Sequence, residues 1–491
     1  MLNMRRTQVK GLCGALLSSA VFALGLGARA HAADKPEALE RPRVIIVGGG
    51  LAGLVTAYEL QERGIPSRIL EAGGTWGGRV ATVEYGKGLH AEYGMHEIWD
   101  KNPLMDYVKK FAIPLSEPEE PYSSFYTEGK LFPYVQDTAA AFQATAFNLE
   151  ERGHFDRWIK ECEALYDETL SGKLTPRLAE LQKLSFAQWV ESYQLPPRVA
   201  EFIRLTIECE IATDWTNFSA VYGIQQEEVF LHGTQQCRHA RDGNHTIIDA
   251  FVNAIRGPKT LGALVTRVVR TRQPDGSIKA VVYYKKDGVM TSVEAERVVV
   301  AVPYHLLHSI QMEPSLTDDQ WKAVDTLIPG MYAVVHFIID TAANGKLLVD
   351  GKNPFPVLTR GPLGVVYGFL EKPAAGQKEE VFTLLVHGDY SRYYLEPEDQ
   401  IRGRLLTELD KIWPGFSAFV HATYFYSHHP AATPGWPVGR SPLDELHASL
   451  RAENVGLYLA GDYLYSSHAD GAVRSGREAA EKVAASLKKQ P

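Results

Sequence analysis

The chain has 491 residues, of which 45% are hydrophobic and 22% are charged. These proportions are typical of globular proteins, and they exclude a disordered chain, a collagen-like chain and a small disulfide-stapled domain. At roughly 100 to 200 residues per domain, the length predicts two or three packed units, or one large unit with an inserted lobe.

The first 32 residues have the pattern of a secretory signal peptide. Arg5, Arg6 and Lys10 precede an apolar run over 11–27, and Ala-His-Ala at 30–32 offers small residues for cleavage. The run is shorter than the roughly 20 residues of a membrane-spanning helix, so a cleaved signal is favoured over an anchor. The two arginines partly resemble a twin-arginine signal, although ordinary signals also carry such pairs. We expect a periplasmic or secreted protein, with twin-arginine export as the favoured route.

The charge balance argues against a nucleic-acid partner. Residues 1–32 carry four basic and no acidic side chains, which leaves 47 basic and 59 acidic residues in the rest of the chain. Net charge bears on encounter and solubility, and this one weakly favours a neutral or cationic substrate. Three cysteines lie beyond the signal: Cys162, Cys209 and Cys237. Their spacing indicates neither a disulfide framework nor a metal site.

The first element after the signal is a βαβ unit. Residues 43–47 are a continuous β-branched run, which is typical of a strand buried on both faces. Apolar residues follow at helical spacing over 51–63, and 67–70 is a second short apolar run. Strand, glycine turn, helix and strand in this order predict a right-handed parallel unit.

The middle of the chain is predicted to be a helical lobe followed by sheet. Residues 139–226 show helical spacing, with Ser185 as an expected N-cap. Two strands at 264–269 and 279–284 flank a Pro-Asp-Gly turn and predict a hairpin. Further strands are expected at 297–302, 332–339, 364–370, 382–386 and 456–460, and a final helix at 471–488.

The turn between the first strand and the first helix is a GxGxxG motif. Gly48 permits the tight turn, Gly50 lets the backbone approach a pyrophosphate, and Gly53 lets the helix pack closely on the strand. The helix N-terminus offers N–H groups to phosphates. Glu71, at the end of the second strand, can accept the ribose hydroxyls. The motif predicts a bound dinucleotide and leaves NAD and FAD open.

The residues after Glu71 resemble the flavin amine oxidase superfamily. Residues 71–80, Glu-Ala-Gly-Gly-Thr-Trp-Gly-Gly-Arg-Val, are similar to the stretch by which that superfamily continues its dinucleotide fold over the pyrophosphate and flavin. Three later segments match it in the same order: 242–255 followed by Val268, 296–303, and 457–462 with 470–480. Arg79 can offset phosphate charge.

The resemblance implies an α/β fold, with a Rossmann-like, doubly wound FAD-binding domain and an interleaved substrate domain of mixed sheet plus helical lobe. The implied FAD-binding domain comprises 40–115, 235–310 and 420–491, and the substrate-binding domain comprises 116–234 and 311–419. FAD is expected to be non-covalent. The residues assigned to it are Gly48, Gly50, Leu51, Ala52, Gly53, Glu71, Ala72, Gly78, Arg79, Gly94, Met95, His96, Val268, Gly461, Asp462, Gly471, Ala472 and Val473.

The resemblance also implies a reaction. In this superfamily the flavin N5 takes a hydride from a carbon next to nitrogen, the resulting imine is hydrolysed, and O₂ or another acceptor reoxidises the flavin. His468 stands where members carry one aromatic wall of the substrate site, Trp436 or Pro437 stands at the other wall, and Tyr426 is a further candidate. The segment 330–337 lacks the lysine that members place near N5, and His336 is its one imidazole.

These departures leave three hypotheses open. The first is an exported FAD-dependent oxidase or dehydrogenase that acts on an amine or amino acid. The second is a flavin-dependent desaturase or isomerase that acts on carbon–carbon bonds of an apolar substrate. The third is a flavoprotein without catalysis. The sequence indicates no metal site for any of them.

Overall fold

The computed structural model describes residues 42–118, 123–133, 147–231, 235–349, 351, 353–368 and 376–488. The expected signal peptide and its arginine pair lie outside these residues, as do 139–146 of the expected helical lobe and 369–370 of an expected strand.

A parallel five-stranded sheet forms the centre of the nucleotide-binding half, and it confirms the predicted βαβ unit. Its order is β20 (Leu457–Leu459), β13 (Arg297–Val300), β1 (Val44–Val47), β2 (Ser67–Leu70) and β9 (Lys259–Thr260). Every residue of β1 and β13 is buried. Continuous β-branched runs suit such strands because both of their faces are covered.

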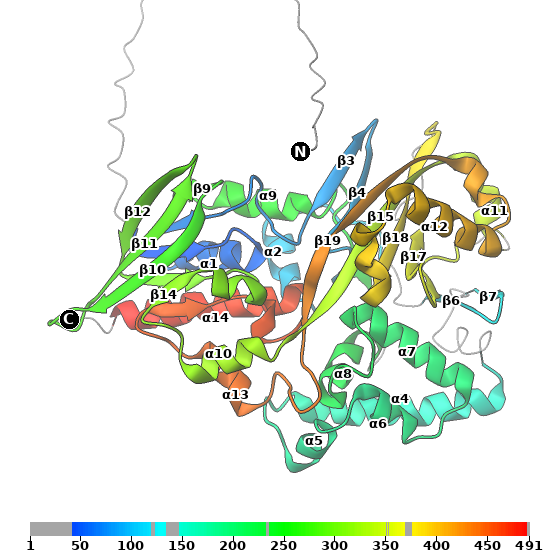
Figure 1. Ribbon diagram of the computed structural model, residues 1–491, viewed down its shortest axis with the longest axis horizontal. Coiled ribbons are helices and arrows are strands. Elements are labelled where there is room, and N and C mark those ends of the chain that lie inside the picture. The colour runs from blue at the N-terminus through cyan, green and yellow to red at the C-terminus, as the bar shows by residue number, and fades with distance from the viewer. Residues whose placement is uncertain are drawn as a thin grey trace, which may run out of the picture. The chain divides into compact units, whose positions relative to one another are not determined.

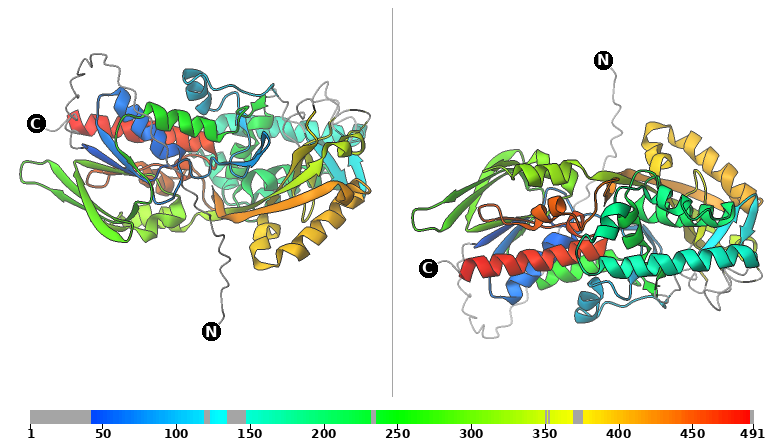
Figure 2. Two further views of the ribbon diagram at one scale, coloured as in Figure 1. Left: turned by 90° about the horizontal axis from the view of Figure 1, so that it is seen from above. Right: turned by 90° about the horizontal axis from the view of Figure 1, so that it is seen from below.

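Helices cover one face of this sheet. α1 (Leu51–Glu62) packs between α14 (Ala469–Lys488) and α9 (His245–Ala254), and the three lie side by side in Figure 2. Ile46 of β1 packs into this helical layer, whereas its neighbour Ile45 packs against the opposite layer. Alternate side chains of a strand point to opposite faces, so one strand contributes to two cores.

The opposite face is covered by an antiparallel sheet that contains the predicted hairpin. The order is β12 (Val289–Ala295), β11 (Ile278–Lys286), β10 (Leu264–Arg272) and β14 (Gln311–Glu313), the last of which is parallel to β10. The hairpin prediction is confirmed. The sequence analysis missed β12, which is largely exposed and so has no buried apolar face to create an alternating pattern.

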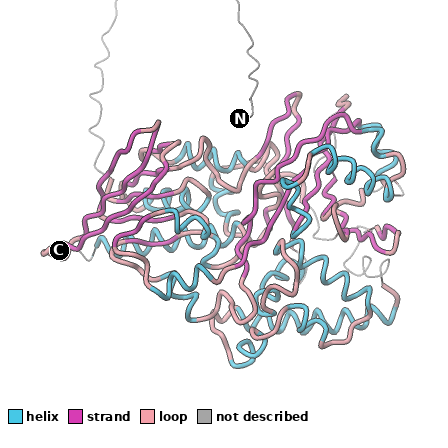
Figure 3. Tube along the Cα trace, viewed as in Figure 1, coloured by secondary structure: helices cyan, strands magenta, loops and turns pink. Residues whose placement is uncertain are grey.

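The second large sheet has seven strands and lies apart from the first in Figures 1 and 3. Its order is β19 (Val420–Gly435), β15 (Ile328–Asp340), β18 (Glu379–His387), β17 (Val365–Gly368), β16 (Val357–Thr359), β6 (Ser124–Thr127) and β7 (Lys130–Phe132). The expected division assigned 420–491 to the FAD-binding domain, whereas β19 pairs along most of its length with β15. α12 (Glu398–Ile412) packs its apolar residues against this sheet.

The helical lobe contains α4 (Leu149–Thr169), α5 (Pro176–Leu181), α6 (Phe186–Glu191), α7 (Pro197–Ile211) and α8 (Ala220–Gln226). Ser185 caps α6 as predicted, since its hydroxyl accepts from the Gln188 N–H and the Gln188 side chain accepts from the Ser185 N–H. Such a reciprocal box satisfies two orphan helix donors. Trp158 and Trp189 pack together in the buried interior of the lobe.

A hairpin of β3 (Thr82–Gly86) and β4 (Leu89–Glu92) reaches from the nucleotide-binding half to the seven-stranded sheet. The remaining short elements are β5 (Ile98–Trp99), α2 (Leu104–Lys110), β8 (Cys237–Arg238), α10 (Asp318–Asp325), α11 (Asn344–Leu347) and α13 (Glu445–Ala448). Within the described ranges, no helix has both the length and the apolar character needed to cross a membrane.

Candidate functional site

A cavity of about 1180 Å³ extends from the glycine turn of β1 to the helical lobe and the seven-stranded sheet. Ligand pockets usually measure roughly 300–1,000 Å³, so this one has room for more than a single small molecule. Its floor includes the carboxyl end of β1 and the N-terminus of α1, while α4, α7 and β15 contribute its far walls.

The three glycines of the turn have distinct roles. A Cβ atom on Gly48, whose φ is +107°, would lie 2.4 Å from the Ala301 carbonyl oxygen, and one on Gly53 would lie 2.1 Å from the Gly48 carbonyl oxygen. A Cβ on Gly50 would meet nothing nearer than 3.9 Å. Gly48 and Gly53 are therefore required by the backbone, whereas Gly50 keeps the adjoining space of the cavity open.

The N-terminus of α1 opens into the same space. Gly50 is its N-cap and no side chain caps the helix, so the first N–H groups of the helix remain available to an anion. Leu51 and Ala52 line the cavity there. Glu71 lies beside them, and its carboxylate accepts hydrogen bonds of 2.6 Å from the Gly49 and Gly73 N–H groups.

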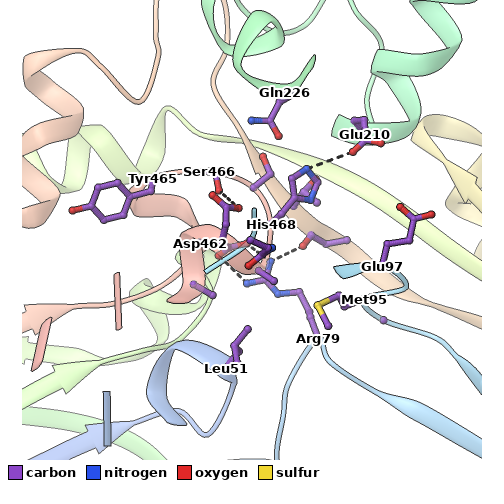
Figure 4. A pocket seen from close by; sticks show the side chains of 18 of the residues that line it. Leu51, Arg79, Met95, Glu97, Glu210, Gln226, Asp462, Tyr465, Ser466 and His468 are labelled. Atoms are coloured by element: carbon purple, nitrogen blue, oxygen red, sulfur yellow. Dashed lines mark hydrogen bonds and ion pairs between the residues drawn. The ribbon is translucent and has the colours of Figure 1, made fainter. Parts of the chain in front are cut away.

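Arg79 and Asp462 form a two-point ion pair on the cavity wall, shown in Figure 4. The Arg79 nitrogens lie 2.6 and 2.8 Å from the two carboxylate oxygens, and the guanidinium also donates to the Ala432 carbonyl. Burial lowers the pKa of Arg79, but the charge and hydrogen bonds of Asp462 outweigh it and raise that pKa. Gly461, Ala72 and Gly78 also line the cavity.

The segment after β4 forms another part of the wall. Gly94 packs so closely on the Arg79 backbone that a Cβ atom would lie 2.1 Å from the Arg79 carbonyl oxygen. Met95 and His96 follow it along the cavity. The Nδ1 atom of His96 lies 2.8 Å from the Gly94 carbonyl and its ring stacks on Tyr367. Burial lowers the pKa of His96 to about 4.

Four expected cofactor residues lie outside the lining of the cavity: Gly53, Val268, Gly471 and Val473. Val268 is fully buried beneath the five-stranded sheet, whereas Val265, across a register shift in β10, lines the cavity. Ala472 of α14 lines the cavity. Gly471 packs on the backbone of Asp462 and Ser466 instead, and Val473 points into the core between α14 and α1.

The structure brings only one of the four expected catalytic side chains to the cavity lining. His468 lies there, and its Nε2 atom is 3.8 Å from Oε2 of Glu210. Trp436 is 0% exposed, packs against Tyr222 with the two rings tilted by 54°, and donates its indole N–H to Nδ1 of His447. Trp436 therefore packs the interface between β19 and the helical lobe, away from the lining.

His336 and Tyr426 belong to a hydrogen-bonded chain behind the wall. His336 is fully buried, with Nε2 at 3.0 Å from the Glu92 carbonyl and Nδ1 at 2.7 Å from the Tyr85 hydroxyl. Because a carbonyl can only accept, Nε2 carries the proton and Nδ1 accepts from Tyr85. The Tyr85 hydroxyl then accepts from Tyr426 at 2.9 Å. Burial lowers the pKa of His336 to about 3.

The sequence analysis missed the residues that line the substrate-facing end. On β15, Tyr332 and Val334 line the cavity where His336 was expected. Carboxylates from three separate segments, Glu97, Glu210 and Glu227, also face it. Only Glu97 lies near a recognised motif, so no local pattern could have connected the three. Lys101 is the single lysine in the lining formed by the described residues.

The part of the cavity next to the glycine turn fits FAD. The open space over Gly50, the uncapped α1 and the adjoining carboxylate of Glu71 match the ADP half of a dinucleotide. The cavity continues past Gly94 and Asp462 and leaves room for a flavin and a substrate beyond it.

Comparison with known proteins agrees with this fit. The sequence profile of the flavin-containing amine oxidoreductase family matches residues 51–484. A 15-cis-phytoene desaturase of Glycine max is 25% identical over 91% of this chain and 80% of its own length. An L-amino acid oxidase of Lachesis muta is 25% identical over 56% of this chain and 53% of its own.

Solved structures show the same fold. A cyclohexylamine oxidase from Brevibacterium oxydans superposes with a TM-score of 0.75 at 19% identity, and the match covers 91% of this chain and 100% of that one. A putrescine oxidase superposes with a TM-score of 0.76 at 20% identity, covering 90% and 98%. The expected α/β class with a mixed substrate sheet is thereby confirmed. The chain belongs to the flavin-containing amine oxidoreductase family and is an FAD-dependent oxidoreductase.

Proposed function

We propose that this protein oxidises an amine at the carbon next to nitrogen, with non-covalent FAD as the hydride acceptor. The observation that carries this proposal is the position of Glu97, Glu210 and Glu227 in the cavity that begins at the glycine turn. Carboxylates in an enclosed space favour a cationic ligand, because an ammonium group compensates the charge that burial penalises.

The same carboxylates discriminate among the candidate substrates. An apolar polyene would bring no cation to Glu210 and Glu227, and an amino acid would bring a further carboxylate beside them. An amine supplies positive charge alone. Arg451 and Arg474 also line the cavity, but neither pairs with Glu210 or Glu227 among the interactions of the described residues.

The chain's own residues would hold the cofactor from both ends. The N-terminus of α1 and Glu71 would bind the ADP half, while Arg79, Asp462 and the start of α14 lie along the continuation of the cavity. The apolar walls around Val334 and Tyr367 exclude water, which protects the reacting carbon and strengthens electrostatic contacts.

The test is anaerobic reduction of the holoprotein. Benzylamine, cyclohexylamine and putrescine should bleach the visible flavin band, and L-amino acids should do so more slowly. If amines leave the band oxidised while an apolar polyene bleaches it, the proposal is wrong. Acid precipitation should release FAD into the supernatant, since the cofactor is proposed to be non-covalent.

A desaturase is the second candidate, and one observation favours it. Val334 occupies the cavity wall on the strand where superfamily oxidases were expected to place a lysine. The phytoene desaturase relative also covers most of the chain. Reduction by a polyene but not by amines would select this candidate.

We further propose that the protein is exported after folding, with its first 32 residues as a twin-arginine signal. FAD contacts contributed by both ends of the chain require a folded protein, which favours a route that carries folded cargo. Replacing Arg5 and Arg6 by lysine should abolish accumulation of the flavoprotein outside the cytoplasm. Undiminished export would contradict the twin-arginine route.

A further inference from the structure

We propose that Glu210 accepts the proton of the substrate ammonium group and thereby prepares the amine for oxidation. This inference rests on the proposed amine oxidation and adds the residue that performs the proton step. No lysine on β15 reaches the cavity to take that role within the described residues.

Glu210 stands near the C-terminal end of α7 and its side chain, 25% exposed, lines the cavity. The carboxylate faces His468 across the space drawn in Figure 4, with 3.8 Å between Oε2 and Nε2. That separation exceeds a hydrogen bond, so the carboxylate oxygen remains able to accept from a ligand. No lysine or arginine forms an ion pair with it among the described residues.

Glu208, one helical half-turn earlier, has a different environment. Its carboxylate lies 2.9 Å from Nε of Arg204 and 3.1 Å from the Trp215 N–H. Glu208 is therefore neutralised by the fold itself. Among the described residues, Glu208 has an arginine partner on its own helix, whereas Glu210 faces the cavity without a lysine or arginine partner.

Two further buried side chains on the same cavity each have one oxygen atom without a hydrogen-bond partner among the described residues. Glu227 is 3% exposed and Gln226 is 8% exposed, and the Oε1 atom of each accepts no hydrogen bond from any described residue. Both residues come from the end of α8 and the turn that follows it. Unsatisfied buried acceptors cost free energy, and a ligand with several N–H donors would satisfy them.

The other titratable groups around Glu210 carry no positive charge that could compensate it. They are Glu97 and Glu227 of the cavity, Cys209 beside it on α7, Tyr222 of α8, Tyr332 of β15 and Tyr367 of β17. Among the described residues, His468 is the one basic group that lies within 4 Å of the Glu210 carboxylate, and burial lowers its pKa.

This environment suits proton transfer near neutral pH. Burial, with a contribution from Glu97, raises the pKa of Glu210 to about 8. A proton acceptor works best when its pKa lies near the working pH. In the step, one N–H bond of the ammonium breaks, an O–H bond forms on Glu210, and the electron pair stays on nitrogen. No electron leaves the substrate in this step, and the neutral amine is the form that can then lose a hydride.

The test compares Glu210→Gln with Glu208→Gln in the holoprotein. Stopped-flow reduction by benzylamine and cyclohexylamine is followed anaerobically from pH 6 to 10. In Glu210→Gln we expect the reduction rate at pH 7.5 to fall about 100-fold. The limb with a pKa near 8 should disappear from its pH profile. Glu208→Gln should keep the wild-type profile, and Glu210→Asp should restore part of the rate.

A second measurement is independent of turnover. Infrared difference spectra of the oxidised wild-type protein at pH 9, where Glu210 is ionised, should gain a protonated carboxyl band when cyclohexylammonium binds. Glu210→Gln should lack this change. If no amine reduces the wild-type flavin but the band still responds, amine oxidation is wrong while the proton-accepting role of Glu210 stands. A wild-type pH profile in Glu210→Gln, or an amine-induced carboxyl band in that variant at pH 9, would overturn the inference.

Discussion

Arg79 and Asp462 are 383 residues apart in the chain, yet both guanidinium Nη atoms bond to the carboxylate. The pair joins the segment after the first βαβ unit to the turn that precedes α14. The pair therefore links an N-terminal and a C-terminal segment of the nucleotide-binding half at the cavity wall.

Breaking this pair should cost both stability and cofactor. Arg79→Ala leaves Asp462, whose side chain is 4% exposed, without its counter-charge. Removing one partner of a buried pair is strongly destabilising, so we expect a loss of about 2 kcal/mol in urea unfolding. Retention of FAD during dialysis should also fall.

Arg267→Ala is the matched control. Arg267 and Glu313 form an equally well-aligned two-point pair, but their side chains are 42% and 41% exposed. Exposed pairs contribute under about 1 kcal/mol. Equal losses in the two variants would contradict a special role for Arg79 and Asp462.

The glycines of the turn should separate folding from binding. Gly50→Ala should fold normally but bind FAD more weakly, because its Cβ would project into open cavity space. Gly53→Ala should fail to fold or be strongly destabilised, because its Cβ would collide with the Gly48 carbonyl. Gly403→Ala, on the exposed face of α12 with nothing within 4 Å, should gain up to about 1 kcal/mol from helix propensity. Thermal unfolding and FAD titration of the apoproteins distinguish these outcomes.

The stability of the ligand-free protein should decrease as the pH rises from about 5 to about 8. Burial, with a contribution from Glu210, raises the pKa of Glu227 to about 8. The folded state therefore holds a proton that the unfolded state has released, and raising the pH through this window favours unfolding. Glu227→Gln should flatten the decrease, whereas Glu313→Gln on the surface should not. At pH 8 we expect the Tm of Glu227→Gln to lie about 2 °C above that of the wild-type protein.

His336 should prove structural. His336→Phe removes both ring hydrogen bonds, to Tyr85 and to the Glu92 carbonyl, and should cost about 2 kcal/mol. The pH profile of flavin reduction should keep its shape, because burial already lowers the pKa of His336 to about 3. Tyr85→Phe should give a smaller loss of the same kind. A missing limb in the profile of His336→Phe would return this histidine to the catalytic candidates.

Local patterns in the sequence were sufficient for the nucleotide-binding half. The β-branched run of β1, the glycine spacing and Glu71 act within about 30 residues of one another, and their roles follow from backbone sterics and strand burial. The hairpin of β10 and β11 and the cap at Ser185 were predictable for the same reason, since each depends on a few adjacent residues.

Only the tertiary structure decided which side chains form the substrate end of the cavity. His336 and Val334 stand two residues apart on β15, and the strand pattern alone does not tell where along its length the cavity begins. Trp436 matched a family position but packs against Tyr222 and His447. No pattern in the sequence around Glu210 indicates that this residue faces the cavity. Its chemistry depends on burial and on carboxylates from distant segments, and both arise only when the helical lobe closes over the cavity.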